Sequence, residues 1–332
     1  MFPLLKARRP VAFFANGLGD AILNLPALRA LAELFPRRLT LVCQRGFHEL
    51  WFSELPLKAV VEQRMWVEDG DRQFSVSEVG GAISGCDLFL SLVPWHSESL
   101  MALLLHLKPA VSIGFFPDFD IALPRDYSKH SADLAFDLPK CLNSSLHLED
   151  YAAPPHFPLV AWQKARHLRG LMQDSLRVLA IHTETVSEKV WPYDRFVAAL
   201  DTFLERHTDF LAFAVGCAHQ PLDVGRHGER VIPVYGLPLI LSCCLVAQAD
   251  LFLGVDSCML HVADFCRVPG VGLFGPTSST EFGFRLSRHR HVRGHGAMKG
   301  VSVASVTEAL DSLLVEANER RDTPKEQESH VT

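Results

Sequence analysis

Short apolar runs alternate along this chain with stretches whose apolar residues recur every three or four positions. In the first half the runs cover residues 11–15, 39–43, 86–93 and 110–115, and Ala21, Leu25, Leu28 and Ala32 follow the first run at helical spacing. Short continuous apolar runs are typical of strands buried on both faces, and spacings of three and four indicate helices. Strands that alternate with helices predict crossover connections and a mostly parallel sheet.

The second half repeats this alternation. Apolar runs cover residues 177–181, 210–215, 231–234, 250–255 and 271–274, and the last helix is expected from Ser305, which with Glu308 fits a capping box. Residues 117–158 lose the rhythm, which predicts closing loops and a linker. We therefore expect two Rossmann-like domains, residues 1–165 and 166–321, and a disordered tail over residues 322–332.

Length and charge narrow the class of protein. The chain has 332 residues, about twice the usual domain size, and 48% of them are hydrophobic, which is enough for two cores. Its formal net charge of -6 argues against a nucleic-acid-binding protein. The eight cysteines form no Cys-x-x-Cys pair, and no run of about 18 apolar residues predicts a transmembrane helix. These features predict reduced thiols and a cytoplasmic location.

The first motif with chemical potential is Asn16-Gly-Leu-Gly-Asp20, between a predicted strand and a predicted helix. Open α/β sheets bind ligands at the carboxyl ends of their strands, so Asp20 is a candidate general base for an acceptor hydroxyl. The competing interpretation is that Asp20 caps the helix. A dinucleotide fingerprint fits less well, because Ile22 stands where a third small residue is needed.

Three further motifs follow strands of the second half. Lys189 precedes a helix that Pro192 opens, so it is either a point charge for a phosphate site or a solvated loop lysine. Asp256 and Ser257 stand between a strand and a helix, where backbone amides can hold a diphosphate. His261 lies one turn further and could donate to a phosphate oxygen or be a buried core histidine.

The remaining candidates are a motif after the next strand and two weaker features. Thr277 follows the next strand in a Gly-Pro-Thr turn and could add a hydroxyl and an amide to the same site. His96 and Glu98 follow a strand of the first half and are candidates for acceptor binding. Residues 288–293 are locally basic, which allows contact with acceptor phosphates or an anionic membrane face, although a solvated strand edge is the simpler interpretation.

These motifs, taken in order, resemble glycosyltransferase family 9, the lipopolysaccharide heptosyltransferases and their relatives. The resemblance extends from about residue 11 to about residue 314 and is most specific over residues 256–277. The segments that carry it are Gly19-Asp-Ala-Ile-Leu-Asn-Leu-Pro-Ala-Leu28, Lys189-Val-Trp-Pro192, Ala249-Asp-Leu-Phe-Leu-Gly-Val-Asp-Ser257 with His261, and Leu273-Phe-Gly-Pro-Thr277.

The resemblance implies a GT-B fold, in which two Rossmann-like domains face each other across a cleft. It implies transfer that inverts the anomeric centre without a metal or a cofactor, with Asp20 as the base. The nucleotide-sugar donor would bind the C-terminal domain, and a glycolipid, saccharide or small-molecule acceptor would bind the N-terminal domain, where Gly19 joins the acceptor candidates. The residues matched to the donor site are Lys189, Asp256, Ser257, Cys258, His261 and Thr277.

The sequence departs from the family pattern at three places. Residues 182–187 read His-Thr-Glu-Thr-Val-Ser where the family commonly has His-Pro-Gly-Ala-Ser, which places Glu184 beside the expected phosphate site. Cys258 replaces a common glycine, and residues 215–220 lack the Gly-Gly-x-x-Glu pattern often found near the donor nucleoside. Heptose, as in ADP-heptose, is therefore one candidate sugar among several.

Two other classes of function compete with a transferase. A nicotinamide-dependent oxidoreductase would need an acidic residue at the end of the second strand, where Cys43-Gln-Arg45 stands. A non-catalytic nucleotide-sugar-binding module is suggested by Glu184 and Cys258. Peripheral contact with the inner membrane face is compatible with either a transferase or a module of this kind.

Overall fold

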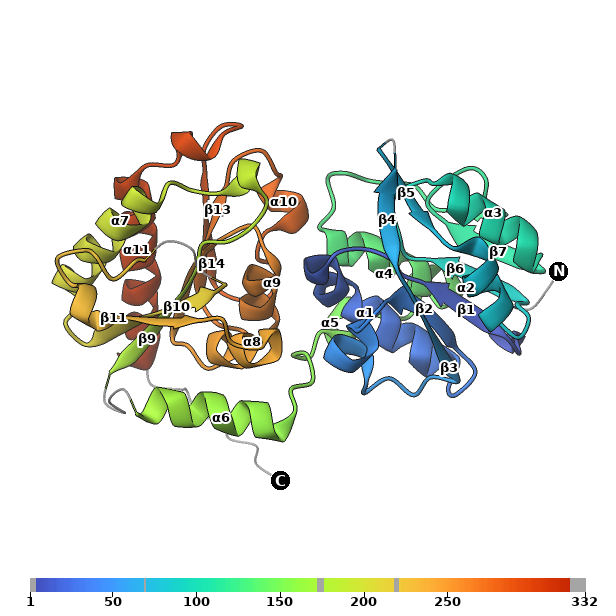
Figure 1. The fold of residues 1–332 in the computed structure, drawn as a ribbon, viewed down its shortest axis with the longest axis horizontal. Coiled ribbons are helices and arrows are strands. Elements are labelled where there is room, and N and C mark those ends of the chain that lie inside the picture. Colours follow the sequence, from blue (N-terminus) through green and yellow to red (C-terminus); the bar gives the residue numbers. More distant parts are fainter. Residues whose placement is uncertain (1–3, 69, 172–175, 218–220, 323–332) are drawn as a thin grey trace, which may run out of the picture. The chain divides into compact units, whose positions relative to one another are not determined.

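A computed structural model describes residues 4–68, 70–171, 176–217 and 221–322. The chain divides into two compact units, one up to Pro158 and the other beginning at Leu159, except that Thr280–Phe282 group with the first (Figure 1). The boundary expected between residues 165 and 166 falls inside helix α6 (Leu159–Gly170), which packs against α8 of the second unit. Of the expected tail, residue 322 ends helix α11, and residues 323–332 lie outside the described part of the chain.

The first unit contains a six-stranded sheet in the order β3-β2-β1-β6-β7-β8, and every neighbouring pair in it is parallel. Its strands are β1 (Pro10–Phe13), β2 (Thr40–Gln44), β3 (Ala59–Gln63), β6 (Leu88–Ser91), β7 (Val111–Gly114) and β8 (Ile121–Ala122), and the antiparallel strands β4 (Met65–Glu68) and β5 (Asp71–Phe74) form a separate pair. Its helices are η1 (Leu4–Lys6), α1 (Leu18–Leu34), η2 (His48–Phe52), α2 (Val76–Ala82), α3 (Glu98–Leu107), α4 (Ser131–Leu142) and α5 (Leu148–Tyr151).

The second unit repeats this architecture in the order β11-β10-β9-β12-β13-β14, again with parallel neighbours. Its strands are β9 (Arg177–His182), β10 (Phe210–Gly216), β11 (Val231–Tyr235), β12 (Leu251–Val255), β13 (Gly270–Phe274) and β14 (His289–Arg293). The helices along this part of the chain are α6, η3 (Ser187–Lys189), α7 (Tyr193–Arg206), η4 (Gly228–Arg230), α8 (Leu239–Ala247), α9 (Cys258–Phe265), α10 (Ser279–Phe282), η5 (Met298–Gly300) and α11 (Val303–Asp322).

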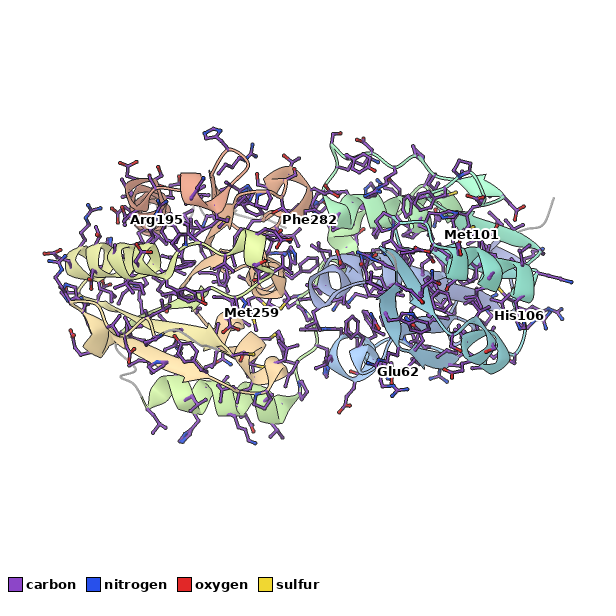
Figure 2. The ribbon with its side chains drawn as sticks, turned by 45° about the horizontal axis from the view of Figure 1, so that its top comes forward. Glu62, Met101, His106, Arg195, Met259 and Phe282 are labelled. Atoms are coloured by element: carbon purple, nitrogen blue, oxygen red, sulfur yellow. The ribbon has the colours of Figure 1, made fainter. Side chains whose placement is uncertain are left out.

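Each sheet is buried on both faces, as the apolar runs predict. Successive residues of β1 point to opposite sides, so Phe13 packs against Phe74 and Phe89 on one face, while Phe14 meets Phe52 on the other. Figure 1 shows helices on both sides of each sheet, and Figure 2 shows the side chains that fill the layers between them. The predicted fold class of two doubly wound, parallel-sheet units is confirmed.

The strand order of each sheet reverses direction at one point. In the first unit the chain runs outward from β1 to β3 and then crosses back to β6 on the other side of β1. In the second unit it runs from β9 to β11 and crosses back to β12. At such a switch point the loops after the two adjacent strands run in opposite directions. In folds of this kind a crevice forms between them at the carboxyl ends of the strands. The loops after β1 and β6, and those after β9 and β12, are therefore the places to look for sites.

Two local expectations are wrong. Residues 117–158 contain α4, which packs against α1, and so are not only loops and linker. The last helix begins at Val303, and its cap is Ser302, whose Oγ accepts the Ser305 N–H at 3.1 Å. Within the described residues, we find no helix long and apolar enough to cross a membrane.

Trp191 ties the loop that follows β9 to the core of the second unit. Its side chain is fully buried, its ring packs edge-on against Phe196 at 4.8 Å between centroids, and its Nε1–H donates to the carbonyl of Val301 at 3.1 Å. Because Lys189 is two residues earlier in the chain, this anchor also restricts where the lysine can lie.

We predict that Trp191→Ala lowers the free energy of unfolding of the second unit by about 3–5 kcal/mol, because it empties a large, fully packed site. Trp66→Ala is the control, since 44% of the Trp66 side chain is exposed. Trp66→Ala should lower the free energy of unfolding by less than about 1 kcal/mol. Urea unfolding followed by circular dichroism measures both, and equal losses would show that Trp191 is not an anchor.

Candidate functional site

The switch point of the second unit is held together by a buried ion pair. Lys189 Nζ lies 2.8 Å from Asp256 Oδ2, and the Asp256 side chain is only 5% exposed against 26% for Lys189. The hydroxyl of Thr185 also donates to the carbonyl of Asp256 at 3.0 Å. The loop after β9 is thereby joined to the loop after β12, and Lys189 is not a solvated loop lysine.

Two hydroxyl groups follow the strands at this edge of the sheet, that of Ser257 after β12 and that of Thr277 after β13. Ser257 is the N-cap residue in extended conformation, but its Oγ makes no capping bond. Ser257 Oγ and Thr277 Oγ1 are both buried and have no hydrogen-bond partner among the described residues. Buried hydroxyls are normally satisfied, so two without partners in the loops after β12 and β13 indicate where a polar ligand would bind.

The turn that carries Thr277 is held close to the body of the unit. A Cβ on Gly275 would lie 2.6 Å from the backbone nitrogen of Met298, so only glycine allows this approach. Thr277 follows β13, the neighbour of β12, and both strands end at the same edge of the parallel sheet. The structure thus brings Asp256, Ser257 and Thr277 to one edge, as the motifs predict.

Cys258 and His261 belong to the first turn of α9. Burial raises the pKa of the Cys258 thiol to about 11, so the thiol is uncharged at neutral pH and adds no negative charge near the helix start. His261 is 4% exposed and lies on the same helix as the buried Met259 (Figure 2). Cys258 is thus a neutral side chain where the family commonly has none.

The switch point of the first unit contains Asp20. Gly17, not Asp20, is the N-cap residue of α1, and the Gly17 N–H donates to Asp20 Oδ2 at 3.2 Å. The carboxylate therefore folds back over the helix start and is partly buried. Gly19 lies in the same turn. This position, just after β1, is where the general-base interpretation requires Asp20 to be.

Arg72 on β5 is a neighbour of Asp20 that no sequence motif indicates. Its Nη1–H donates to Asn16 Oδ1 at 2.8 Å, and its guanidinium lies over the ring of Trp95, 5.0 Å from the centroid. Burial lowers the pKa of Arg72, and the negative charge of Asp20 opposes that shift. Arg72 thus places a positive charge close enough to Asp20 for the two groups to interact electrostatically.

The hairpin that carries Arg72 has a sequence signal that could have revealed it. Residues 65–68 and 71–74 flank an Asp69-Gly70 pair, a common two-residue hairpin turn, and Gly70 has a φ of +82°. The hairpin is fixed by Phe74, whose ring lies 5.2 Å from that of Phe13.

The weaker acceptor candidates lie on the loop after β6. His96 Nε2 is 3.6 Å from Asp118 Oδ2, and the two side chains are about half exposed, at 46% and 52%. Glu98 begins α3, and its backbone N–H donates to Asp71 Oδ2 at 3.2 Å. Glu98 is therefore beside the hairpin, and His96 is the chain neighbour of Trp95, whose ring contacts the Arg72 guanidinium.

The basic segment is an edge strand, as its simpler interpretation predicts. It forms β14, in which His289 and His291 stack at 4.5 Å between centroids. Arg290 forms an ion pair with Glu316. Part of this positive charge is thus neutralised within the unit.

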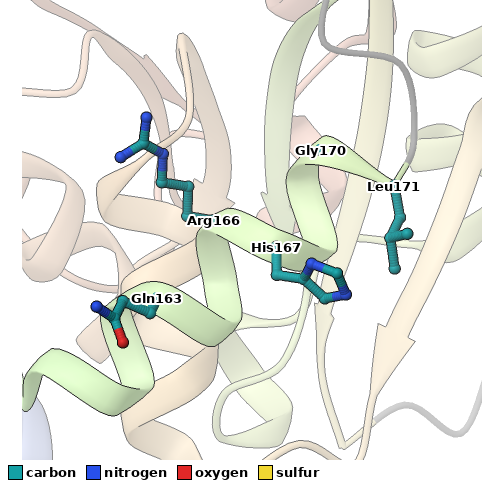
Figure 3. Close-up of a pocket in the computed structure, with 5 residues that line it drawn as sticks. All are labelled: Gln163, Arg166, His167, Gly170 and Leu171. Carbon is teal, nitrogen blue, oxygen red and sulfur yellow. The ribbon is translucent and has the colours of Figure 1, made fainter.

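A hollow of about 660 Å³ lies on helix α6, away from these loops (Figure 3). Gln163, Arg166, His167, Gly170 and Leu171 line it. Helix α6 leads into the amino end of β9, and Arg169 beside the hollow pairs with Asp250, at the amino end of β12. The hollow is thus on the opposite edge of the sheet from Asp256 and contains none of the predicted site residues.

A comparison with protein families matches residues 236–306 to glycosyltransferase family 9 (heptosyltransferase). That segment contains Asp256, Ser257, Cys258, His261 and Thr277. No match was found among curated proteins.

Solved structures match nearly the whole chain. A glycosyl transferase family 9 protein from Veillonella parvula is 19% identical, with a TM-score of 0.74 and coverage of 94% of this chain and 99% of that one. Escherichia coli heptosyltransferase WaaC with ADP is 15% identical, with a TM-score of 0.66 and coverage of 92% and 99%. Escherichia coli ADP-heptose LPS heptosyltransferase II is 14% identical, with a TM-score of 0.67 and coverage of 93% and 99%.

These similarities show the fold, which is the GT-B arrangement of the heptosyltransferases. The family match and the fold together support a glycosyltransferase rather than an oxidoreductase. The resemblance to glycosyltransferase family 9 is confirmed, by sequence over residues 236–306 and by fold over nearly the whole chain.

Proposed function

We propose that the protein is an inverting, metal-independent glycosyltransferase that moves a sugar from a nucleoside-diphosphate donor to an acceptor hydroxyl. The observation that carries the proposal is the cluster at the end of β12, where the Lys189–Asp256 pair adjoins two open hydroxyls within the segment matched to family 9. ADP-heptose is the donor to test first, because structures of the solved neighbour WaaC contain ADP or ADP-2-deoxy-2-fluoro heptose.

In the proposed reaction, Asp20 accepts the proton of the acceptor hydroxyl as its oxygen attacks the anomeric carbon of the donor. The bond from that carbon to the phosphate oxygen breaks, and the leaving diphosphate gains negative charge. Attack on the face opposite the leaving group inverts the anomeric centre. Asp20 later releases its proton to solvent.

The residues of the second unit would receive the leaving diphosphate. The first backbone amides of α9 point outward from the helix and carry partial positive charge, and Ser257 and Thr277 can each donate an O–H. Lys189 adds a full positive charge that Asp256 holds in place. Donors fixed in advance stabilise developing charge more effectively than water, which must reorient.

The acceptor and the setting of the reaction are part of the proposal. An acceptor on the first unit would contact the surroundings of Asp20, which include Arg72, Trp95 and Gly19. A lipopolysaccharide precursor is one such acceptor, and peripheral association with the inner face of a membrane, from the cytoplasm, would bring the enzyme to it. A soluble saccharide or small molecule would need no such association.

We predict that Asp20→Asn lowers kcat by at least about 100-fold while donor affinity changes less than about twofold, because the amide cannot accept the proton. The amide oxygen can still accept the Gly17 N–H, so the helix start is kept. Nucleotide release measures turnover and calorimetry measures donor binding.

The control is Asp133→Asn. Asp133 is the third residue of α4, as Asp20 is the third residue of α1, so the variant makes the same change at the same helical position elsewhere. Turnover of Asp133→Asn should remain near that of the unchanged protein. Undiminished turnover of Asp20→Asn would exclude the base assignment. Donor binding by the unchanged protein without turnover on any acceptor would favour a non-catalytic binding module.

We predict that Lys189→Met lowers the free energy of unfolding of the second unit by about 3 kcal/mol, since it leaves the buried Asp256 carboxylate without its partner. The double variant Lys189→Met/Asp256→Asn should recover at least half of this loss. Both variants should bind nucleoside diphosphates at least about 10-fold more weakly, about 1.4 kcal/mol. Recovery of binding together with stability would show that Lys189 acts on Asp256 alone.

A further inference from the structure

Glu184 stands at the switch point of the second unit and is not used by the proposed diphosphate site. It is the second residue after β9, in the same loop as Thr185, which bonds to Asp256 of the neighbouring strand's loop. A carboxylate here is unfavourable for a phosphate, because the two charges repel each other. A ligand group other than a phosphate would suit Glu184 better.

The side chain of Glu184 is held in place by the end of strand β10. His182 Nδ1 donates to the carbonyl of Val215 at 3.0 Å, and burial lowers the pKa of His182, so the imidazole is neutral. Two residues further, the Cys217 N–H donates to Glu184 Oε2 at 2.7 Å. These two bonds fix the loop and the carboxylate without any ligand.

Gly216 makes this arrangement possible. It has a φ of +146°, and a Cβ at this position would lie 2.9 Å from both Cδ and Oε2 of Glu184. A side chain on residue 216 would therefore displace the carboxylate. The absence of a side chain at Gly216 thus leaves room for the carboxylate in this position.

The second carboxylate oxygen of Glu184 has no hydrogen bond of its own among the described residues. This oxygen, Oε1, is buried. Leaving a buried acceptor unsatisfied costs about 1–3 kcal/mol, and more when the group is charged. The carboxylate is held in place through Oε2, at the carboxyl ends of β9 and β10. Its Oε1 can therefore accept a hydrogen bond from an O–H group of a ligand.

The polar groups at this edge of the sheet are of two kinds. Among the described residues, the ion pair of Lys189 is with Asp256 and not with Glu184. Ser257 and Thr277 offer O–H donors, which suit phosphate oxygens, whereas Glu184 offers only acceptors, which suit hydroxyls. A nucleotide sugar contains both kinds of group, phosphates in the middle and hydroxyls on either side.

We propose that Glu184 determines donor specificity by accepting hydrogen bonds from hydroxyl groups of the nucleotide sugar. The proposal rests on the proposed function, since it concerns the donor of that reaction. The hydroxyls belong either to the ribose or to the transferred sugar, and the same chemistry serves both.

The test compares ligands that differ by one hydroxyl. Calorimetry gives the affinities of ADP, UDP and GDP and of their 2′-deoxy and 3′-deoxy counterparts for the unchanged protein and for Glu184→Gln. The amide oxygen of glutamine can still accept the Cys217 N–H, while its NH₂ group replaces the open acceptor with a donor. The variant therefore separates recognition from anchoring, and equal thermal midpoints check that the fold is kept.

We expect the unchanged protein to bind its preferred ribonucleotide about 10- to 100-fold more tightly than a deoxy counterpart, and Glu184→Gln to lose most of this ratio. If the hydroxyls are those of the sugar, the ratio that Glu184→Gln loses is instead the one between ADP-heptose and ADP. Glu188→Gln is the matched control, because it removes the same charge from an exposed residue four positions later. It should leave both ratios unchanged.

Two results would overturn the inference. If Glu184→Gln leaves both ratios intact, or binds all diphosphates more tightly whatever their hydroxyls, the carboxylate only repels phosphate. The proposed function would then stand without it. If the unchanged protein binds none of these nucleotides, the proposed function and the inference fail together.

Discussion

Parallel strands can be joined only by crossovers that return over a face of the sheet, and this constraint determines where the protein can place a site. In each six-stranded sheet all strands end at one edge, and the strand order reverses once, between β1 and β6 and between β9 and β12. Asp20 and Lys189, which are far apart in the sequence, lie beside these two reversals. The chain therefore contains two similar switch points with opposite chemistry, a carboxylate beside an arginine in one and a lysine beside unpartnered hydroxyls in the other.

The Lys189–Asp256 pair is the interaction on which the second crevice depends. It joins the loops of the two strands at the reversal, and Trp191 holds the lysine loop against the core. A buried ion pair contributes little net stability, but removal of one partner is costly, so the pair restricts the loops to one arrangement. Such preorganisation suits a site that must stabilise a leaving diphosphate, because the donors need not move when charge develops.

Prediction from the sequence succeeded where residue types alone determine the local structure. Apolar runs predicted both sheets, and turns at strand ends predicted the region of Asp256 and Thr277. It failed where tertiary contacts decide. Helix α4 was mistaken for loop, because residues 117–158 are rich in Pro, His and Asp. Arg72 was missed, because its proximity to Asp20 arises from the hairpin packing on Phe13. The sequence indicates Glu184 only as a carboxylate that conflicts with the expected phosphate site. Its position beside Gly216, which has a positive φ, appears only in the structure.

The central claim, that a nucleotide binds at the carboxyl ends of β9, β12 and β13, is tested most directly by hydrogen exchange with and without the preferred nucleoside diphosphate. Ligand-bound loops open less often, so their amides exchange more slowly. The account predicts slower exchange over residues 183–189, 256–261 and 275–279 at saturating nucleotide, with helix α6 unchanged. Protection confined to α6 or to the first unit, or no protection anywhere, would contradict it.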